Sequence, residues 1–306
     1  MGTFCEVQVY DSNASRAESA IRAALDEMAR IDHLLSDYDP ASELSVMNRE
    51  AAKGPFHASA ELFEFVTLCR RFYDNTLGTF DPTVGALVRA WGFFSRQPGV
   101  PSAPEISGAK AASGFDKVRL NESDRTILYT TPELEMDPGG IGKGYAVDKA
   151  VAVLKGLGIR SALVSAGGSS MYGIGHPPGK SGWKVAISNP SDPGKPFALV
   201  DLRDNSLSSS GVSHQSVKDG AHSYSHIFDP RNGAPVENIC QVTVVAPTGT
   251  ETDALTKAAF ILARDQVIDV LKRYSGAHAL RVEGGCRANS PVWATPWSSA
   301  VFVHSP

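Results

Sequence analysis

Cysteine is scarce in this chain and unpatterned. Its 306 residues contain four cysteines (Cys5, Cys69, Cys240 and Cys286), which lie far apart and show neither a Cys-x-x-Cys motif nor a Cys/His spacing. Zinc sites and disulfide frameworks need ligands or partners at recognisable intervals. The sequence therefore favours buried free thiols over a zinc site or a disulfide framework.

An excess of charge of one sign and a long apolar run are also missing. The chain has 29 Lys and Arg against 33 Asp and Glu, for a net charge of −4. This balance argues against a nucleic-acid footprint or a membrane-surface patch. No apolar run approaches the roughly 20 residues that a membrane span needs. No basic-then-apolar leader opens the sequence, but a leader removed earlier would leave the same chain.

The chain has enough apolar residues for a large core. Hydrophobic residues make up 42% of the sequence, with 28 glycines and 19 prolines. We predict a single domain over residues 1–306, with two closely packed subdomains as the alternative. The Pro-rich loop expected at Pro98–Pro104 is the only candidate boundary.

Helical and strand patterns alternate along the chain. Apolar spacing predicts helices over Ala14–Leu35, Ser59–Asn75, Val84–Trp91, Val147–Leu157, Asp253–Ala263 and Gln266–Tyr274. Strands are predicted over Phe4–Tyr10, Val118–Leu120, Thr126–Tyr129, Ala162–Ser165, Trp183–Ser188, Phe197–Leu202, Ser206–Ser210, Val242–Ala246, His278–Val282 and Ala300–His304. Hairpin connections mixed with helices favour an α+β fold with mixed or antiparallel sheets over a doubly wound parallel sheet.

The most informative stretch is residues 137–148, which read DPGGIGKGYAVD. Four glycines surround Lys143, and a helical pattern follows at once. Glycines let a ligand approach the main chain closely, and the start of a helix favours negative charge. A lysine among them adds a mobile positive charge, so phosphate is the expected ligand. The alternative is a tight turn into a helix with an ordinary surface lysine.

Other short stretches contain more Gly, Pro, Asp and Ser than packing requires. They are Gly78–Gly85 (with Thr79, Phe80, Asp81 and Thr83), Ser42–Asn48 (with Glu43, Ser45 and Asn48, near Tyr38), Ser165–Ser169, Ser208–Gly211 and Tyr224–Pro230. Phe80 is a candidate aromatic wall, and the end of the strand before Gly167 is a candidate point of ligand approach. Taken singly, each stretch is typical of a turn.

Taken in order, these stretches resemble the sequence blocks of the ApbE-type FAD:protein FMN transferase family. Residues 137–148 are similar to that family's DLGGIAKGYAVD block, residues 78–93 to its FDPTVG…WGF block, and residues 226–235 to its HIIDPRTGxP block. Further matches at residues 1–3, 38–48, 163–168, 209–211 and 243–261 extend the resemblance over nearly the whole chain.

The resemblance implies an enzyme that cleaves FAD, attaches FMN through a phosphoester to a Thr or Ser of a partner protein, and releases AMP. It implies that His226 is the base that accepts the proton of the target hydroxyl, and that Lys143 neutralises a phosphate. The residues implied to contact FAD are Met1, Thr79, Phe80, Asp81, Asp137, Lys143 and Ile227, with His226 beside them. The family also implies an extracytoplasmic location.

The resemblance further implies a magnesium site, and here the chain departs from the family pattern. The implied ligands are the main-chain carbonyl of Gly140, the side chain of Asp253, and a Thr four residues later on the same helix. Lys257 occupies that last position, and Thr256 lies one residue too early. Since residues four apart share a helix face, an Asp253–Lys257 ion pair is the expected local outcome.

Three alternatives for this position remain open. Lys257 replaces the metal as a fixed positive charge. Or it swings out towards solvent, and Thr256 or water completes a weakened metal site. Or transfer is lost, which leaves a non-catalytic FAD-binding protein or an FAD pyrophosphatase.

Overall fold

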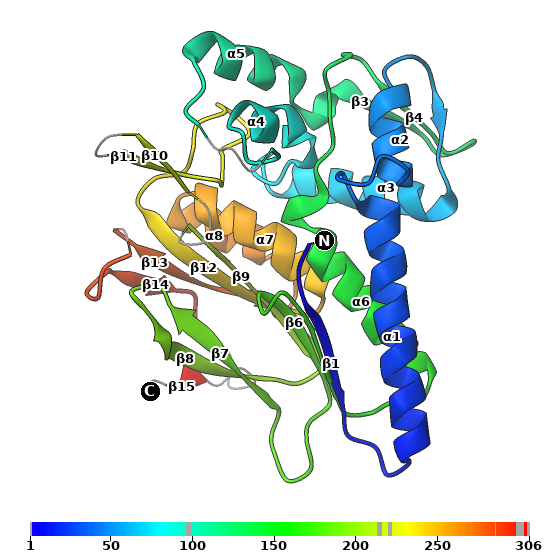
Figure 1. Cartoon of the computed structure of the whole chain (residues 1–306). Helices are drawn as coiled ribbons and strands as arrows, with labels where there is room; N and C mark the ends of the chain where they lie inside the picture. Colours follow the sequence, from blue (N-terminus) through cyan, green and yellow to red (C-terminus); the bar gives the residue numbers. More distant parts are fainter. Residues whose placement is uncertain are drawn as a thin grey trace. The chain divides into compact units, whose positions relative to one another are not determined.

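The computed structural model describes residues 2–95, 99–212, 216–219, 222–284, 286–297 and 303–304. The chain forms two compact units (Figure 1). Unit 1 comprises Met1–Asp32, Ile141–Ser213 and Asn238–Pro306, and unit 2 comprises His33–Gly140 and His214–Glu237. Unit 1 is therefore built from three separate stretches of sequence.

Unit 1 is organised around a seven-stranded sheet with the strand order β1-β5-β6-β9-β12-β13-β14. Every neighbouring pair in it is antiparallel. Its strands are β1 (Cys5–Val9), β5 (Ala162–Ala166), β6 (Ser170–Ile174), β9 (Asn205–Gly211), β12 (Ile239–Ala246), β13 (His278–Glu283) and β14 (Val292–Ala294). The predicted α+β fold with antiparallel pairing is confirmed.

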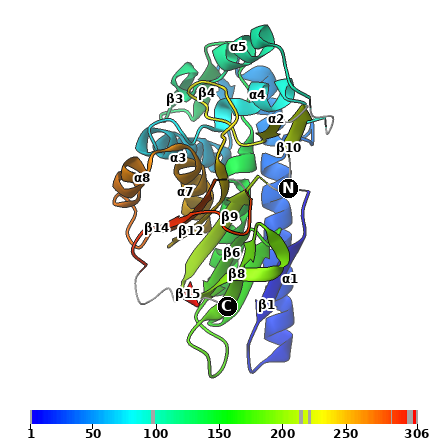
Figure 2. The ribbon, with the colours of Figure 1, turned by 90° about the vertical axis from the view of Figure 1, so that its left-hand side faces the viewer.

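The two faces of this sheet are covered differently. Helices α1 (Ala14–Leu35) and α6 (Gly142–Gly156) pack apolar side chains on one face, and α7 (Gly249–Ile261), followed by α8 (Arg264–Leu271), lies next to α6, β9 and β12. The other face contacts a three-stranded sheet of β7 (Trp183–Asn189), β8 (Asp192–Leu202) and β15 (Val303–His304) (Figure 2). Residues on β9 therefore alternate: Leu207 packs against this smaller sheet, whereas Ser208 faces α7.

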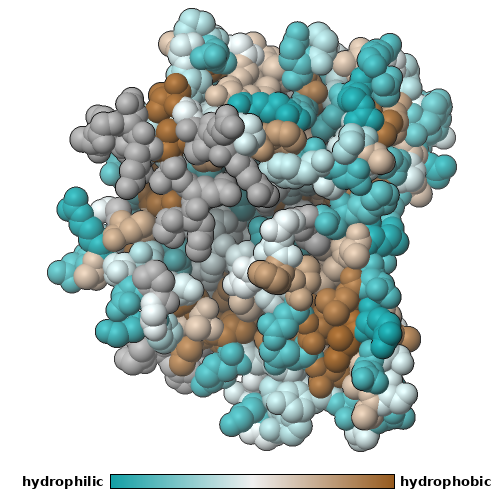
Figure 3. All heavy atoms as spheres, in the orientation of Figure 1, coloured by the Kyte–Doolittle hydropathy of each residue, from teal (hydrophilic) through white to brown (hydrophobic). Residues whose placement is uncertain are grey.

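Strand β1 is an edge strand of the large sheet, since it pairs only with β5. Its residues Cys5, Val7 and Val9 pack against the core but are only partly buried. Apolar atoms gather near this strand on the face shown in Figure 3, and Phe4 just before it is 94% exposed. This edge of unit 1 is thus less fully covered than its centre.

In its described residues, unit 2 combines four helices with short strands. The helices are α2 (Glu43–Glu50), α3 (Ala60–Asn75), α4 (Gly85–Ala90) and α5 (Ala103–Ala112). The strands are β2 (Phe56–His57), β4 (Thr126–Tyr129) and β3 (Val118–Asn121), which form one antiparallel sheet, and the hairpin β10 (Ser216–Asp219) and β11 (His222–Ser225). The 3-10 turns Pro82–Val84, Phe115–Lys117 and Pro138–Gly140 connect these elements.

Most of the predicted helices and strands are present, but helices that begin with glycine or proline start at residues other than those predicted. Helices α6 and α7 begin at Gly142 and Gly249, several residues before the predicted Val147 and Asp253. Pro98 of the predicted Pro98–Pro104 loop lies outside the described residues, and the rest of that segment leads into α5, where Pro104 sits in the first turn and tolerates its missing N–H.

The stretch after β5 proved to be a turn. Gly167 and Gly168, both with φ of +63°, turn the chain between β5 and β6. Only glycine adopts this conformation readily, so both glycines are explained by the hairpin. The turn reading of Ser165–Ser169 is correct, and strand β6 was not predicted.

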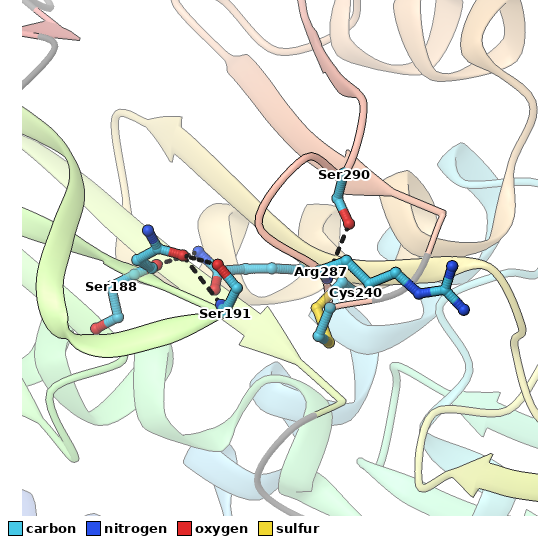
Figure 4. Close-up of a disulfide and its surroundings, with 8 residues drawn as sticks. Ser188, Ser191, Cys240, Arg287 and Ser290 are labelled. Atoms are coloured by element: carbon cyan, nitrogen blue, oxygen red, sulfur yellow. Dashed lines mark hydrogen bonds between the residues drawn. A yellow bond between two sulfur atoms is a disulfide. The ribbon is translucent and has the colours of Figure 1, made fainter.

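The prediction of four free thiols is wrong for two of them. Cys240 in β12 forms a disulfide with Cys286, 46 residues later, while half-buried Cys5 and buried Cys69 are free (Figure 4). The cause is tertiary: β12 and β13 are antiparallel neighbours, with Ile239 opposite Glu283. This register brings the chain just after β13 back beside Cys240.

We expect the disulfide to stabilise unit 1. Replacing Cys286 with serine should lower the free energy of unfolding by about 2–4 kcal/mol, since the open chain gains entropy when unfolded. Urea unfolding with and without reductant measures this, and a Cys5→Ser variant is the control. Alkylation of the unfolded protein should label two cysteines before reduction and four after it. Equal labelling in both conditions would contradict the disulfide.

Candidate functional site

Lys143 lies in the first turn of α6, where the sequence predicts a phosphate site. The N-cap residue is Ile141, whose apolar side chain makes no capping hydrogen bond. Within the described residues the Lys143 ammonium has no hydrogen bond or ion pair, and the side chain is partly buried. The N–H of Gly144 in the same turn is accepted by the Asp253 carboxylate, so the feature of this helix start that can attract an anion is the ammonium of Lys143. The structure thus retains the features from which the phosphate site was predicted.

Helices α6 and α7 meet backbone to backbone at two glycines. A Cβ built on Gly144 would lie 2.0 Å from the carbonyl oxygen of Gly249, and one on Gly249 would lie 2.6 Å from that of Gly144. One turn along α6, the Asp148 carboxylate accepts the N–H groups of Gly249 (2.6 Å) and Thr250 (2.8 Å). Burial raises the pKa of Asp148 to about 6. These contacts fix the start of α7 against the start of α6.

We expect Gly144→Ala to destabilise the protein by about 3 kcal/mol or more, because the added methyl group meets rigid main chain. A matched control is Gly156→Ala near the end of the same helix, where a Cβ would meet nothing within 4 Å. There the helix propensity of alanine should leave stability unchanged or raise it slightly. Chemical unfolding of both variants measures the difference. Equal stabilities would contradict the close approach.

Asp253 on α7 is tied to the start of α6 and to β6. Its Oδ2 accepts the N–H of Gly144 at 2.7 Å, and its Oδ1 accepts the hydroxyl of Ser170 at 2.7 Å. Both carboxylate oxygens are therefore engaged by donors. The sequence predicted Asp253 as a site residue, and the structure brings it to Gly144, the neighbour of Lys143.

The side chain of Lys257 is held by three oxygens. Its Nζ donates to Ser210 Oγ (3.0 Å), to Thr256 Oγ1 (3.0 Å) and to the main-chain oxygen of Asp253 (3.3 Å). Burial lowers the pKa of Lys257 to about 8, although the charge of Asp253 works in the opposite direction. The predicted ion pair between the Asp253 carboxylate and the Lys257 ammonium is wrong. The ammonium binds the main-chain oxygen of Asp253, whereas the carboxylate points to α6 and β6. The alternative in which Lys257 swings out is also wrong.

The side chains present do not fit a divalent ion at this place. The Asp253 carbonyl and the Thr256 hydroxyl are bound by the Lys257 ammonium, and a second cation at such short range would be strongly repelled. In the described part of the chain, no three His, Cys, Asp or Glu side chains form a group that could hold a metal ion. Gly140, whose carbonyl was the third implied ligand, ends the 3-10 turn Pro138–Gly140 of unit 2.

In unit 2, the side chains of Thr79, Phe80, Asp81 and Thr83 in the Gly78–Gly85 motif make hydrogen bonds and packing contacts within the protein. Asp81 Oδ1 accepts the N–H and the hydroxyl of Thr83 (2.8 and 2.6 Å), and burial raises the pKa of Asp81. Thr79 donates to a main-chain oxygen, and Phe80 packs edge-on against Phe72. Phe80 is 2% exposed, so it is not an aromatic wall. The roles of these residues in FAD binding stay predictions.

Asp137 connects two of the predicted motifs. Its N–H donates to the carbonyl of Pro82 at 2.7 Å, and its Oδ1 accepts the N–H of Gly139 at 2.6 Å. Within unit 2, the loop around Asp137 is thereby anchored on the Gly78–Gly85 motif. Met1, also predicted to contact FAD, lies outside the described residues.

His226 and Ile227 follow β11. At this place the aromatic residues Trp91 and Phe93 contact the rings of His226 and Phe228. The ring of His226 lies edge-on to Phe93, at 6.1 Å between centroids, and Phe228 contacts Phe93 and Trp91. The Ile227 side chain is buried. The Trp91–Phe93 part of the predicted FDPTVG…WGF block and the start of the predicted 226–235 block are thus in contact. His226 is partly buried and its catalytic role stays a prediction.

Unit 2 also contains a cavity of about 470 Å³ that sequence reasoning identified only in part. Tyr38, Ser45 and Asn48 line it as the sequence suggested, whereas Glu43 instead accepts hydrogen bonds from Ser59 at the start of α3. Tyr38 is 60% exposed.

Several other residues that line this cavity were not identified from the sequence, among them Asp37, Arg89 and Phe94. The ring of Phe94 stacks on Tyr38 at 4.6 Å, and the Arg89 guanidinium lies over Phe94 at 3.7 Å while pairing with Glu135. Asp37 also lines the cavity, and burial, aided by the charge of Asp137, raises its pKa to about 7. The only sequence signal was adjacency: Asp37 precedes Tyr38, and Phe94 follows the Trp-Gly-Phe motif.

Comparison with known proteins agrees with these motifs. The model of the ApbE family matches residues 1–281. An FAD:protein FMN transferase of Klebsiella pneumoniae is 33% identical over 97% of this chain and 85% of its own length, and one of Escherichia coli K12 is 32% identical over 99% and 87%.

Solved structures agree as well. The ApbE protein of Thermotoga maritima superposes with a TM-score of 0.87 at 27% identity, over 96% of this chain and 94% of its own. The flavin transferase ApbE of Vibrio cholerae gives 0.81 at 25% identity, over 98% and 95%. The resemblance seen in the sequence motifs is confirmed, and the chain belongs to the ApbE family.

Proposed function

We propose that this chain is an FAD:protein FMN transferase. It cleaves FAD, joins FMN through a phosphoester to a hydroxyl of a partner protein, and releases AMP. The whole-length similarity to enzymes of that name supports the reaction. The observation within the structure that carries the proposal is the ammonium of Lys143 in the first turn of α6, which has no hydrogen bond or ion pair within the described residues.

The chemistry assigns separate tasks to Lys143 and His226. Lys143 and the start of α6 hold the diphosphate and neutralise the phosphoryl group as it transfers. His226 accepts the proton of the target hydroxyl, a task suited to an imidazole at neutral pH. The hydroxyl oxygen forms the new bond to phosphorus, the bond to the bridging oxygen breaks, and its electrons leave with AMP.

We further propose that the cavity lined by Tyr38 and Phe94 accepts the flavin ring. Its volume of about 470 Å³ falls within the range of ordinary ligand pockets. A flat aromatic ring system stacks well on an exposed tyrosine. Asp37 and the Arg89–Glu135 pair supply polar groups at its wall that can orient the ring.

Magnesium is not part of this proposal. It was expected from the resemblance alone, and the oxygens around Lys257 do not fit a divalent ion. Every role assigned above belongs to a side chain or to the main chain.

An extracytoplasmic location is also a proposal. The Cys240–Cys286 disulfide supports it, since disulfides form and persist mainly in oxidising compartments. Separately, none of the helices in the described residues has the length and apolar character to cross a membrane. The partner is a protein that presents a Thr or Ser to the site.

The test is incubation with FAD and a candidate acceptor, read by in-gel flavin fluorescence and by release of AMP. Transfer gives a covalently fluorescent acceptor that is lost when the target hydroxyl is removed. AMP release without any label would indicate an FAD pyrophosphatase, and FAD binding without AMP release would indicate a binding protein. Either result, obtained with an acceptor that a relative labels, would contradict the proposal.

A further inference from the structure

The Lys257 ammonium sits in an oxygen-lined position that resembles a cation site. Its three oxygen partners come from two elements, α7 and β9, and lie at 3.0, 3.0 and 3.3 Å. The partners are also bonded to one another: Ser210 Oγ and Thr256 Oγ1 are 3.0 Å apart, and Thr256 donates to the Asp253 carbonyl at 2.7 Å. The position is therefore prearranged and not merely occupied by a loose side chain.

We infer that Lys257 supplies a built-in positive charge in place of a divalent metal ion, so that this chain binds FAD and transfers FMN without magnesium. The inference rests on the proposed function, and it adds which group of the chain neutralises the negative charge of the FAD diphosphate. It selects one of the three alternatives that the sequence left open.

The hydrogen bonds around Asp253 support this assignment. A carboxylate that held a divalent ion would direct an oxygen at it, yet both oxygens of Asp253 accept hydrogen bonds, from Gly144 and from Ser170. The carboxylate therefore serves as a nearby counter-charge and as a link between α7 and α6. The ammonium takes the carbonyl and hydroxyl oxygens that remain.

The charges in this region also explain how an ammonium group can replace a divalent ion in neutralising phosphate charge. Lys143 and Lys257 lie close enough that the charge of Lys143 acts on Lys257, and Asp253 acts on it with the opposite sign. Two ammonium groups together carry the same positive charge as one divalent ion. One of them has no partner among the described residues and can bind phosphate directly, while the other is fixed by three oxygens.

The experiment compares metal dependence in the natural chain and in three variants of it. Lys257→Met removes the charge at nearly constant length, Lys257→Arg retains it, and Lys257→Thr restores a hydroxyl at the position where the family has one. Lys272→Met, at the residue that follows α8, is the control, since this exposed lysine pairs only with Asp269 within the described residues. Calorimetry measures the binding of Mg²⁺ alone and the binding of FAD with and without chelator, and thermal unfolding verifies that each variant folds.

We expect the natural chain to bind no Mg²⁺ and to hold FAD equally well with and without chelator. Lys257→Met should weaken FAD binding by about ten-fold or more, and Mg²⁺ should not restore it. Lys257→Thr should become dependent on Mg²⁺ for both FAD binding and transfer. This gain of metal dependence does not rely on Lys257→Met being stable, and a purely structural lysine would not produce it.

Two outcomes would overturn the inference alone: FAD binding by the natural chain that is lost with chelator and restored by Mg²⁺, or unchanged FAD affinity and transfer in folded Lys257→Met. Failure of the natural chain and of Lys257→Thr to bind FAD, with or without Mg²⁺, would instead overturn the proposed function, and the inference with it.

Discussion

Replacing His226 with alanine should reduce FMN transfer by about 10²–10⁴-fold, the usual contribution of a general base. FAD binding should change little, because the role assigned to His226 is to accept a proton from the target hydroxyl and not to hold the dinucleotide. The rate of appearance of fluorescent acceptor measures transfer, and calorimetry with FAD measures binding. The variant should therefore lose transfer activity while its affinity for FAD stays nearly unchanged.

The matched control is His57→Ala, which removes an exposed histidine from β2. It should leave both transfer and FAD binding unchanged. A purely structural role for His226, packing against Phe93, would lower the stability of His226→Ala without a selective loss of transfer. Transfer at the natural rate in a folded His226→Ala protein would exclude the residue as the base.

Replacing Lys143 with methionine should weaken FAD binding by about 10- to 100-fold, because charge-assisted hydrogen bonds to the diphosphate are lost. The transfer rate at saturating FAD should fall as well, since the ammonium also neutralises the phosphoryl group during the reaction. Stability should change little, as the side chain has no internal partner among the described residues. FAD titration followed by flavin fluorescence gives the affinity.

Lys149→Met, later on the same helix, is the control for this experiment. The Lys149 ammonium lies over the ring of Tyr145, at 4.9 Å from the centroid, and the loss of this contact should cost about 1 kcal/mol of stability. FAD affinity should be retained. Comparable FAD affinity in the Lys143 and Lys149 variants would remove the central support for a phosphate site at the start of α6.

The start of α6 could be predicted because the residues that define it are neighbours in the sequence. A lysine among glycines before a helical pattern predicts an anion site wherever that helix lies, and α6 does begin at Gly142, directly before Lys143. Thr248 and Glu251 form a capping box at the start of α7, a local signal that the predicted helix start at Asp253 overlooked.

The roles of other residues could not be predicted, because their partners are distant in the sequence. Asp148 lies in a recognised motif, yet its role depends on Gly249 and Thr250, about a hundred residues later. The cavity beside Tyr38 likewise depends on Arg89 and Phe94, which no spacing rule connects to it.

By itself, the sequence determined the family, the α+β class, the order of the motifs and the presence of a lysine where the family has a metal ligand. Only the tertiary structure decided that Cys240 joins Cys286, and that the Lys257 ammonium binds a carbonyl and two hydroxyls while the Asp253 carboxylate turns to α6. The physical reason is the range of the forces involved. Propensity, capping and glycine conformation act between neighbours in the chain, whereas strand register and helix packing choose partners across it.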